Sequence, residues 1–217
     1  MQNVPLVAHV ARRVCRTGIV DRVIVATDHG SIAEAVVRWC PEVEIQRVDG
    51  PRRSGSDRVA AAVADLPAAR IVNVQGDEAL VDAADLRGAL RGLERAPVGT
   101  VASPAGPADD LSDPDVVKVR VDGRGLALDF TREAPRAAAP TPLIHRGIYS
   151  FTRASLQRFA GLPTCGPERC ERLEQLRLVE AGIPIAVEQT RGAAGAVNRP
   201  RDVPRVEALL RSTRQVA

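Results

Sequence analysis

The chain has 217 residues, of which 45% are hydrophobic and 2% aromatic, so it is long enough for one core built from Val, Leu, Ile and Ala. Its 30 Lys and Arg residues against 27 Asp and Glu give a net charge of +3, which is too slight and too dispersed to indicate a nucleic-acid partner. No apolar run reaches the roughly 20 residues of a membrane span, and the N-terminus lacks the regions of a signal peptide, so we expect a cytoplasmic protein with no membrane partner.

Helical and extended apolar patterns alternate along the first half of the chain, which predicts an α/β fold with a mainly parallel sheet. The predicted elements are a helix over 5–16 that ends at Gly18, a strand over 23–28, helices over 31–39 and 56–66 with Ser56 as the N-cap of the second, a strand over 71–74 and a helix over 83–95.

Beyond Val98 the pattern changes to shorter, alternating segments. The predicted elements are strands over 116–121 and 126–130 joined by a hairpin at Asp122-Gly123, a loop over 134–142, a strand over 143–151, a helix over 168–181, a strand over 183–188 and a final helix that starts at Pro200. Four cysteines are too sparse for a disulfide scaffold, and Cys165 and Cys170 have no second Cys or His pair to complete a zinc site.

The most informative stretch is the strand over 71–74, which runs into the turn Gln75-Gly-Asp77-Glu78. Gly76 allows a sharp turn just past the carboxyl end of the strand, which is the edge where open α/β sheets bind ligands. An Asp at this edge can hold Mg²⁺ against phosphate oxygens, because that ion prefers hard oxygen ligands. The alternative is an ordinary Asp-Gly turn.

Six segments, in their order and spacing, resemble the CMP-Kdo synthetase family (3-deoxy-manno-octulosonate cytidylyltransferases), a branch of the sugar nucleotidyltransferases. They are Ile24–His29, Ser54–Arg58, Asn73–Glu78, Asp129–Arg132, His145–Tyr149 and Leu173–Arg177. The resemblance implies a Rossmann-like nucleotidyltransferase three-layer sandwich with a small β-rich lobe. It also implies transfer of CMP from CTP to the acidic sugar 3-deoxy-manno-octulosonate (Kdo) with release of pyrophosphate, for lipopolysaccharide assembly, with Mg²⁺ as cofactor.

We therefore expect residues 1–217 to form one nucleotidyltransferase domain, in which about 1–112 bind the nucleotide. By the resemblance, about 113–190 form the sugar-binding and dimerisation lobe of a homodimer, with a dimer contact at 168–181, and 191–217 form a C-terminal helix.

On the nucleotide side, the resemblance implies that Asp77 is the catalytic metal-binding carboxylate and that Ser54-Gly55-Ser56 binds the cytidine. A glycine between two hydroxyls lets the backbone approach a base edge, although such a turn can also be an ordinary helix cap. Arg58 would add positive charge near the nucleotide, or only solvate a helix face.

On the sugar side, the resemblance implies contacts from Gln75, Arg132, His145, Tyr149, Glu174 and Gln175. Arg132 suits the sugar carboxylate, because a guanidinium pairs with a carboxylate through two hydrogen bonds. His145 and Tyr149 are four residues apart on a strand and so share a face, although a lone His is often structural. Gln75 can instead bond the neighbouring strand, and Glu174 and Gln175 can instead face solvent.

Two departures from the family matter. Members of the family begin with a strand and an Arg- and Lys-bearing loop that cradles the triphosphate, whereas this sequence starts at the helix that follows. We expect that strand to lie between 23–27 and 71–74, and a misplaced start codon would explain the difference. In addition, Asn198 stands where the family has a second acidic metal ligand; its amide oxygen can coordinate, but one negative charge is lost.

These departures leave two alternatives open. One is a degenerate, non-catalytic homologue that binds nucleotide, sugar or a protein partner. The other is a cytidylyltransferase for a different acidic sugar, since Arg132 selects a carboxylate and not the remaining hydroxyls.

Overall fold

The computed structural model describes residues 1, 3–106, 109–135, 142–191 and 195–214. Its strands are β1 (Ile24–Thr27), β2 (Glu44–Arg47), β3 (Arg70–Val74), β4 (Val98–Pro104), β5 (Lys118–Val121), β6 (Ala127–Thr131), β7 (Leu143–Thr152) and β8 (Ile185–Gln189). Its helices are α1 (Leu6–Thr17), α2 (Gly30–Trp39), α3 (Gly55–Ala62), α4 (Ala83–Gly92), α5 (Arg153–Gly161), α6 (Gly166–Glu171), α7 (Leu176–Glu180), the 3₁₀ turn η1 (Pro200–Asp202) and α8 (Val203–Arg214).

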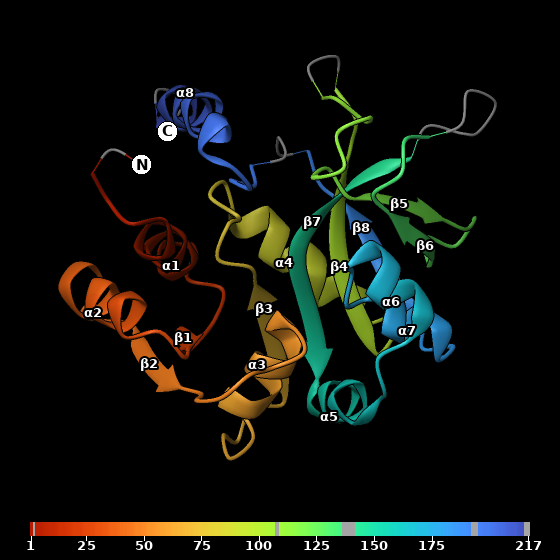
Figure 1. Cartoon of the computed structure of the whole chain (residues 1–217), viewed down its shortest axis with the longest axis horizontal. Coiled ribbons are helices and arrows are strands. Elements are labelled where there is room, and N and C mark those ends of the chain that lie inside the picture. The colour runs from red at the N-terminus through yellow and green to blue at the C-terminus, as the bar shows by residue number, and fades with distance from the viewer. Residues whose placement is uncertain (2, 107–108, 136–141, 192–194, 215–217) are drawn as a thin grey trace.

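A six-stranded sheet forms the centre of the molecule, in the order β6-β5-β7-β4-β8 (Figure 1). The sixth strand, β3, pairs with the second half of β7 on the edge opposite β4, the same edge on which β5 pairs with the start of β7. The strands β1 and β2 form a separate parallel pair beside α1 and α2, and within the described residues the two sheets share no strand pair. The α/β fold is confirmed. The prediction of a mainly parallel sheet was wrong for the large sheet, where only β4 and β8 pair in parallel.

The antiparallel pairing has a simple origin. The long strand β7 inserts between β3 and β4 and runs antiparallel to both, so β3 and β4 still point in the same direction. Val74, the last residue of β3, pairs with Ile148. The first residues of β7 therefore lie beside the turn that follows β3, and this juxtaposition builds the site described below.

Two predicted helices differ from the structure. The first of them, α3, is capped by Ser54 and not by Ser56, because the Ser54 hydroxyl accepts from the Asp57 backbone N–H at 3.1 Å. The helix predicted over 168–181 is broken into α6 and α7 at Arg172, whose φ of 54° is left-handed. Such a residue ends a helix, and the chain after it turns toward α3.

Three elements were not predicted from the sequence: β2, β4 and α5. The short strand β2 is mostly exposed, so its burial pattern gives no clear period. Every residue of β4 except its last is buried, so the strand lacks the alternation that marks a half-exposed strand. The predicted loop over 134–142 falls mainly on 136–141, which lie outside the described residues.

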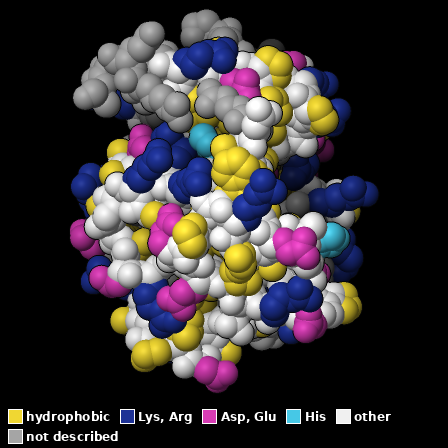
Figure 2. Space-filling view, turned by 90° about the vertical axis from the view of Figure 1, so that its left-hand side faces the viewer, with side chains coloured by type: hydrophobic (Ala, Val, Ile, Leu, Met, Phe, Trp, Pro, Cys, Tyr) yellow, Lys and Arg dark blue, Asp and Glu magenta, His cyan; other side chains and the backbone are white. Residues whose placement is uncertain are grey.

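The core lies on both faces of the large sheet. One cluster is built around Phe130, Phe151 and Phe159, and a second joins α1 and α4 to the opposite face through Val10 and Leu86. On the side of the molecule that carries α1 and α2, Lys and Arg side chains are interspersed with acidic and hydrophobic ones (Figure 2). Among the described helices, none has the length and apolar character needed to cross a membrane.

Candidate active site

A cleft of about 600 Å³ opens where β3 ends and β7 begins. Its walls come from the start of α3, the turn after β3, the first half of β7, the α6–α7 segment and the segment 195–198. Most of the predicted site residues line it: Ser54, Gly55, Gln75, Asp77, Arg132, His145, Tyr149, Glu174, Gln175 and Asn198. Segments that are distant in the sequence thus meet at one cleft.

Asp77 lies in a turn that is attached to its surroundings on two sides. The Gln75 backbone N–H donates to the Gly147 carbonyl at 2.8 Å, and the Val197 N–H donates to the Asp77 carbonyl at 2.9 Å. The carboxylate itself is unsatisfied, because its Oδ1 is buried with no hydrogen-bond partner among the described residues. Burial accordingly raises the pKa of Asp77. A buried acceptor without a donor is suited to a ligand that the chain itself does not supply.

Asn198 is placed beside this turn by the adjacent pairing of Val197. Its Nδ2 donates to the Asp115 carbonyl at 3.5 Å, and its backbone N–H donates to Asp202 Oδ2 at 2.9 Å. Since the amide nitrogen is engaged, the amide oxygen remains for coordination. Asp202 is used as a cap and does not take the place of the family's acid.

The floor of the cleft holds a buried ionic cluster that sequence reasoning missed. Arg146 is 1% exposed and binds Asp85 Oδ1 at 2.6 Å, while its Nε lies 3.9 Å from Glu78 Oε2. Glu78 Oε1 accepts from the Gly147 N–H at 2.6 Å. Burial raises the pKa of Glu78 to about 7 against the opposing charge of Arg146. A charged residue in the middle of the strand predicted over 143–151 was the available signal.

Gly147 allows the Gln75 side chain to approach β7 closely. A Cβ at this position would lie 2.3 Å from Gln75 Oε1. The side chain of Gln75 therefore packs directly on the β7 backbone, and both residues line the cleft.

His145 and Tyr149 lie on one wall of the cleft, with ring centroids 5.2 Å apart. The Thr100 hydroxyl donates to the Ile148 carbonyl at 2.8 Å, so it accepts from His145 Nε2 at 2.9 Å. This arrangement fixes the tautomer with the proton on Nε2 and leaves Nδ1 as an acceptor. Burial, together with the nearby charge of Arg146, lowers the pKa of His145 to about 3, so the ring is neutral. Burial also raises the pKa of Tyr149.

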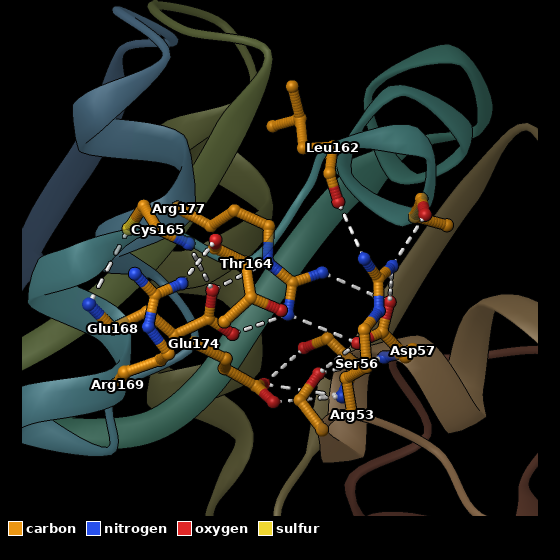
Figure 3. A network of polar contacts seen from close by, with 12 residues as sticks. Arg53, Ser56, Asp57, Leu162, Thr164, Cys165, Glu168, Arg169, Glu174 and Arg177 are labelled. Atoms are coloured by element: carbon orange, nitrogen blue, oxygen red, sulfur yellow. Dashed lines mark hydrogen bonds and ion pairs between the residues drawn. The ribbon is translucent and has the colours of Figure 1, made fainter.

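Ser56 and Arg58, both predicted for the nucleotide, do not line the cleft. Ser56 is buried, and its backbone N–H and hydroxyl both donate to the carboxylate of Glu174 (Figure 3). Arg58 is turned away and binds Asp28 at 2.8 Å and the Val48 carbonyl at 2.9 Å. Ser54 is the extended N-cap residue of α3, whereas Ser56 and Arg58 lie inside the helix and have partners of their own, which a linear motif does not distinguish.

Arg132 lines the cleft with part of its guanidinium already engaged. Its Nε donates to the Glu171 carbonyl at 2.9 Å and its Nη1 to the Pro114 carbonyl at 2.8 Å. The buried Lys118 fixes the backbone of the same residue, since its Nζ donates to the Arg132 carbonyl at 2.8 Å. These bonds fix the position of the guanidinium and leave Nη2 for a ligand. Lys118 was not predicted, although a single lysine on a buried strand was a visible signal.

The chain matches the family model described as "Cytidylyltransferase" over residues 1–188. It is 38% identical over 222 residues to the 3-deoxy-manno-octulosonate cytidylyltransferase of Syntrophotalea carbinolica, covering 95% of this chain and 88% of that protein. The corresponding enzyme of Mesorhizobium japonicum is 39% identical over 224 residues, covering 97% of this chain and 90% of that protein.

Solved structures give the same result. A CMP:2-keto-3-deoxy-manno-octonic acid synthetase complexed with CTP superposes with a TM-score of 0.82 at 33% identity, covering 96% of this chain and 88% of that one. A 4-diphosphocytidyl-2C-methyl-D-erythritol synthase, at 17% identity and a TM-score of 0.65 over 94% of this chain and 88% of that one, shares the fold. The chain therefore belongs to the cytidylyltransferase family, among the 3-deoxy-manno-octulosonate cytidylyltransferases.

Proposed function

We propose that this protein transfers CMP from CTP to Kdo and releases pyrophosphate, as a step toward lipopolysaccharide. The observation that carries the proposal is the cleft itself, which is lined both by Asp77, with its unpaired carboxylate oxygen, and by polar side chains suited to bind a sugar, such as Arg132 and His145. Since CTP is an intracellular substrate, the proposed reaction takes place in the cytoplasm.

The reaction needs positioning and charge neutralisation more than a covalent nucleophile. The anomeric hydroxyl of the sugar attacks the α-phosphorus of CTP. The bond from that phosphorus to the bridging oxygen breaks, pyrophosphate leaves with the electron pair, and the hydroxyl proton passes to solvent or to a nearby acceptor. The chain's part is to hold the two substrates in line and to prevent water from replacing the sugar.

The described residues fit a bound Mg²⁺. Asp77 Oδ1 is a buried acceptor without a donor among the described residues. Asn198, whose amide oxygen is not used by its bond to Asp115, follows Val197, which pairs with the Asp77 backbone. Within the described residues no group of three or more His, Cys, Asp or Glu gathers as a metal site. The proposed ion would be held by one carboxylate, an amide, water and substrate phosphates. When bound there, Mg²⁺ would neutralise charge on the phosphates.

The sugar side would recognise a carboxylate and hydroxyls. Arg132 offers the Nη2 edge of a guanidinium that its other bonds hold in place. His145 Nδ1 can accept from a sugar hydroxyl, because the ring is neutral and its other nitrogen is occupied by Thr100. Gln75 and Gln175 add amides that can donate and accept.

The proposal includes the division of labour along the chain and a homodimer. About 1–112 would bind CTP, about 113–190 would bind the sugar and carry the dimer contact, and 191–217, which includes α8, would form the C-terminal helix. Light scattering on the purified protein tests the dimer: a mass near twice 23.1 kDa supports it, and a monomer mass refutes it.

Product formation tests the function. CTP, Mg²⁺ and Kdo are mixed with the protein, and the CMP-sugar is detected by mass spectrometry, with a second acidic sugar as a parallel substrate. Asn198, which removes one charge from the metal site, favours a second candidate, a homologue that binds without turnover. Calorimetric binding of CTP with no product would support that candidate.

A further inference from the structure

A single buried guanidinium joins the two walls of the cleft (Figure 3). Arg177 lies on α7 with its side chain 1% exposed, and its Nη1 and Nη2 each donate to one oxygen of Asp57 on α3 at 3.1 Å. Its Nε donates to Glu168 Oε2 on α6 at 2.9 Å, and Nη2 also bonds Oε1 of that carboxylate. The ring of Phe159 lies 4.4 Å from the guanidinium carbon.

The network pairs the Arg177 guanidinium with the carboxylates of Asp57 and Glu168. Burial opposes ionisation of Asp57, but hydrogen bonds from Arg177, Ser54 and Arg53 outweigh it and lower the pKa of that carboxyl. Burial likewise opposes the charge on Arg177, and its bonds to Glu168 and Asp57 outweigh it and raise its pKa. Buried ion pairs often stabilise a fold no better than well-packed apolar residues would. We therefore consider which parts of the cleft this network holds in place, and not how much it stabilises the fold.

The network holds the nucleotide side of the cleft through Asp57. That carboxylate accepts from the Ser54 hydroxyl at 2.9 Å, and Arg53 Nη2 reaches it at 2.8 Å. Ser54 caps α3 and lines the cleft. The position of the Ser54–Ser56 turn therefore depends on where Arg177 holds Asp57.

The same guanidinium holds the sugar side. Arg177 follows Glu174 and Gln175 within one turn of chain, and both of those residues line the cleft. Glu174 reaches back across the cleft wall to the Ser56 N–H, which is a second bridge between the two sides. Two contacts, 118 and 120 residues apart in sequence, thus tie the start of α3 to the segment 174–177.

We propose that Arg177 is a positioning residue that couples the nucleotide and sugar sides of the cleft, an inference that rests on the proposed function. Arg177 does not line the cleft. It acts by keeping the cytidine turn and the Glu174–Gln175 turn in one fixed relation. A lysine in its place would keep the charge but could not bond two carboxylates through a planar fork.

The test compares Arg177→Lys and Asp57→Asn with the control Arg153→Lys. Arg153, at the start of α5, likewise donates from its guanidinium to distant partners, the backbone carbonyls of Ala64 and Ala68, but it does not line the cleft. The measurements are KM for CTP, KM for Kdo, kcat, the melting temperature, and the calorimetric Kd of CTP alone. We expect Arg177→Lys to raise both KM values by about tenfold, a typical coupling factor, and to weaken CTP binding in the absence of sugar.

The outcomes separate cleanly. The inference is overturned if Arg177→Lys lowers only the melting temperature, as Arg153→Lys should, or if it changes KM for one substrate alone. Turnover by the unmodified protein tests the proposed function independently. If Kdo is not the sugar, the Kd of CTP for Arg177→Lys still decides the inference. Arg177 lies on α7, on the sugar side, so a weaker affinity for CTP would show that this helix acts on the nucleotide side.

Discussion

Asp77 is partly buried, and one of its two carboxylate oxygens lacks a hydrogen-bond partner among the described residues. Its Oδ1 has no donor, and burial raises its pKa. Replacing it by Asn removes a buried charge, so the free energy of unfolding should stay the same or rise. Turnover should fall by about 100-fold or more, because one group that stabilises developing charge is lost.

Urea unfolding and initial rates, measured on the same preparation of Asp77→Asn, check this prediction. The exposed Asp65→Asn is the matched control and should change neither quantity. A variant that keeps its activity, or one that loses activity only because it unfolds, would contradict the assignment of Asp77 to the site.

His145 makes the stability of the fold depend on pH. Its pKa is about 3 in the folded protein, against 6.5 for an ordinary histidine, so the unfolded chain binds a proton below pH 6.5 that the folded chain does not. The contribution of His145 to the free energy of unfolding is therefore fully present above that pH. It decreases as the pH falls, by up to about 1.4 kcal/mol per pH unit.

His145→Gln keeps a donor for Thr100 but does not titrate. Urea unfolding between about pH 6.5 and 5 should show that the free energy of unfolding falls less steeply with pH in this variant than in the unmodified protein. The difference in slope should correspond to one proton. Identical slopes would mean that the ring is already solvated in the folded state.

Candidate site residues came from the family resemblance of six sequence segments. Asp77, Arg132, His145 and Tyr149 were expected at one site, and the structure places them around one cleft. Arg146 was not predicted, because its role depends on Asp85, a partner on another element that no local pattern announces.

At the scale of elements, the end of the first helix was predicted from a single residue, whereas the N-cap of α3 was misplaced by two residues. Gly18 ends α1 in the left-handed conformation, as expected. The sheet was predicted less well, because the place of β7 between β3 and β4 is decided by long-range packing. The break at Arg172 was also missed, since no glycine or proline marks it.

Helix α4 packs closely on β4 at Gly99. A Cβ on Gly99 would lie 2.1 Å from the Ala89 carbonyl and 2.6 Å from Ser150 Oγ. Because the nearest atom belongs to the helix backbone, it cannot move aside without shifting α4. We expect Gly99→Ala to destabilise the fold by about 3 kcal/mol.

Thermal and urea unfolding check this expectation. Gly161→Ala is the control, since nothing lies within 4 Å of a Cβ built there. Equal stability of the two variants would show that the helix can withdraw from the sheet.

At the scale of the whole molecule, the cleft is the meeting point of segments from across the chain. The turn after β3 supplies Asp77, β7 supplies His145, the α6–α7 segment supplies Glu174, and the segment before η1 supplies Asn198. Only the antiparallel insertion of β7 brings the second of these beside the first. The order of motifs therefore pointed to the function, while the three-dimensional fold decided which side chains face one another.

The central claim is that this cleft joins CTP to an acidic sugar with Mg²⁺ held at Asp77. The most direct test follows pyrophosphate release from CTP while Kdo and Mg²⁺ are each added and withheld. The account predicts release only when both are present, and a loss of at least about 100-fold in Asp77→Asn. Release that is independent of Kdo, or CTP binding with no release under any of these conditions, would contradict it.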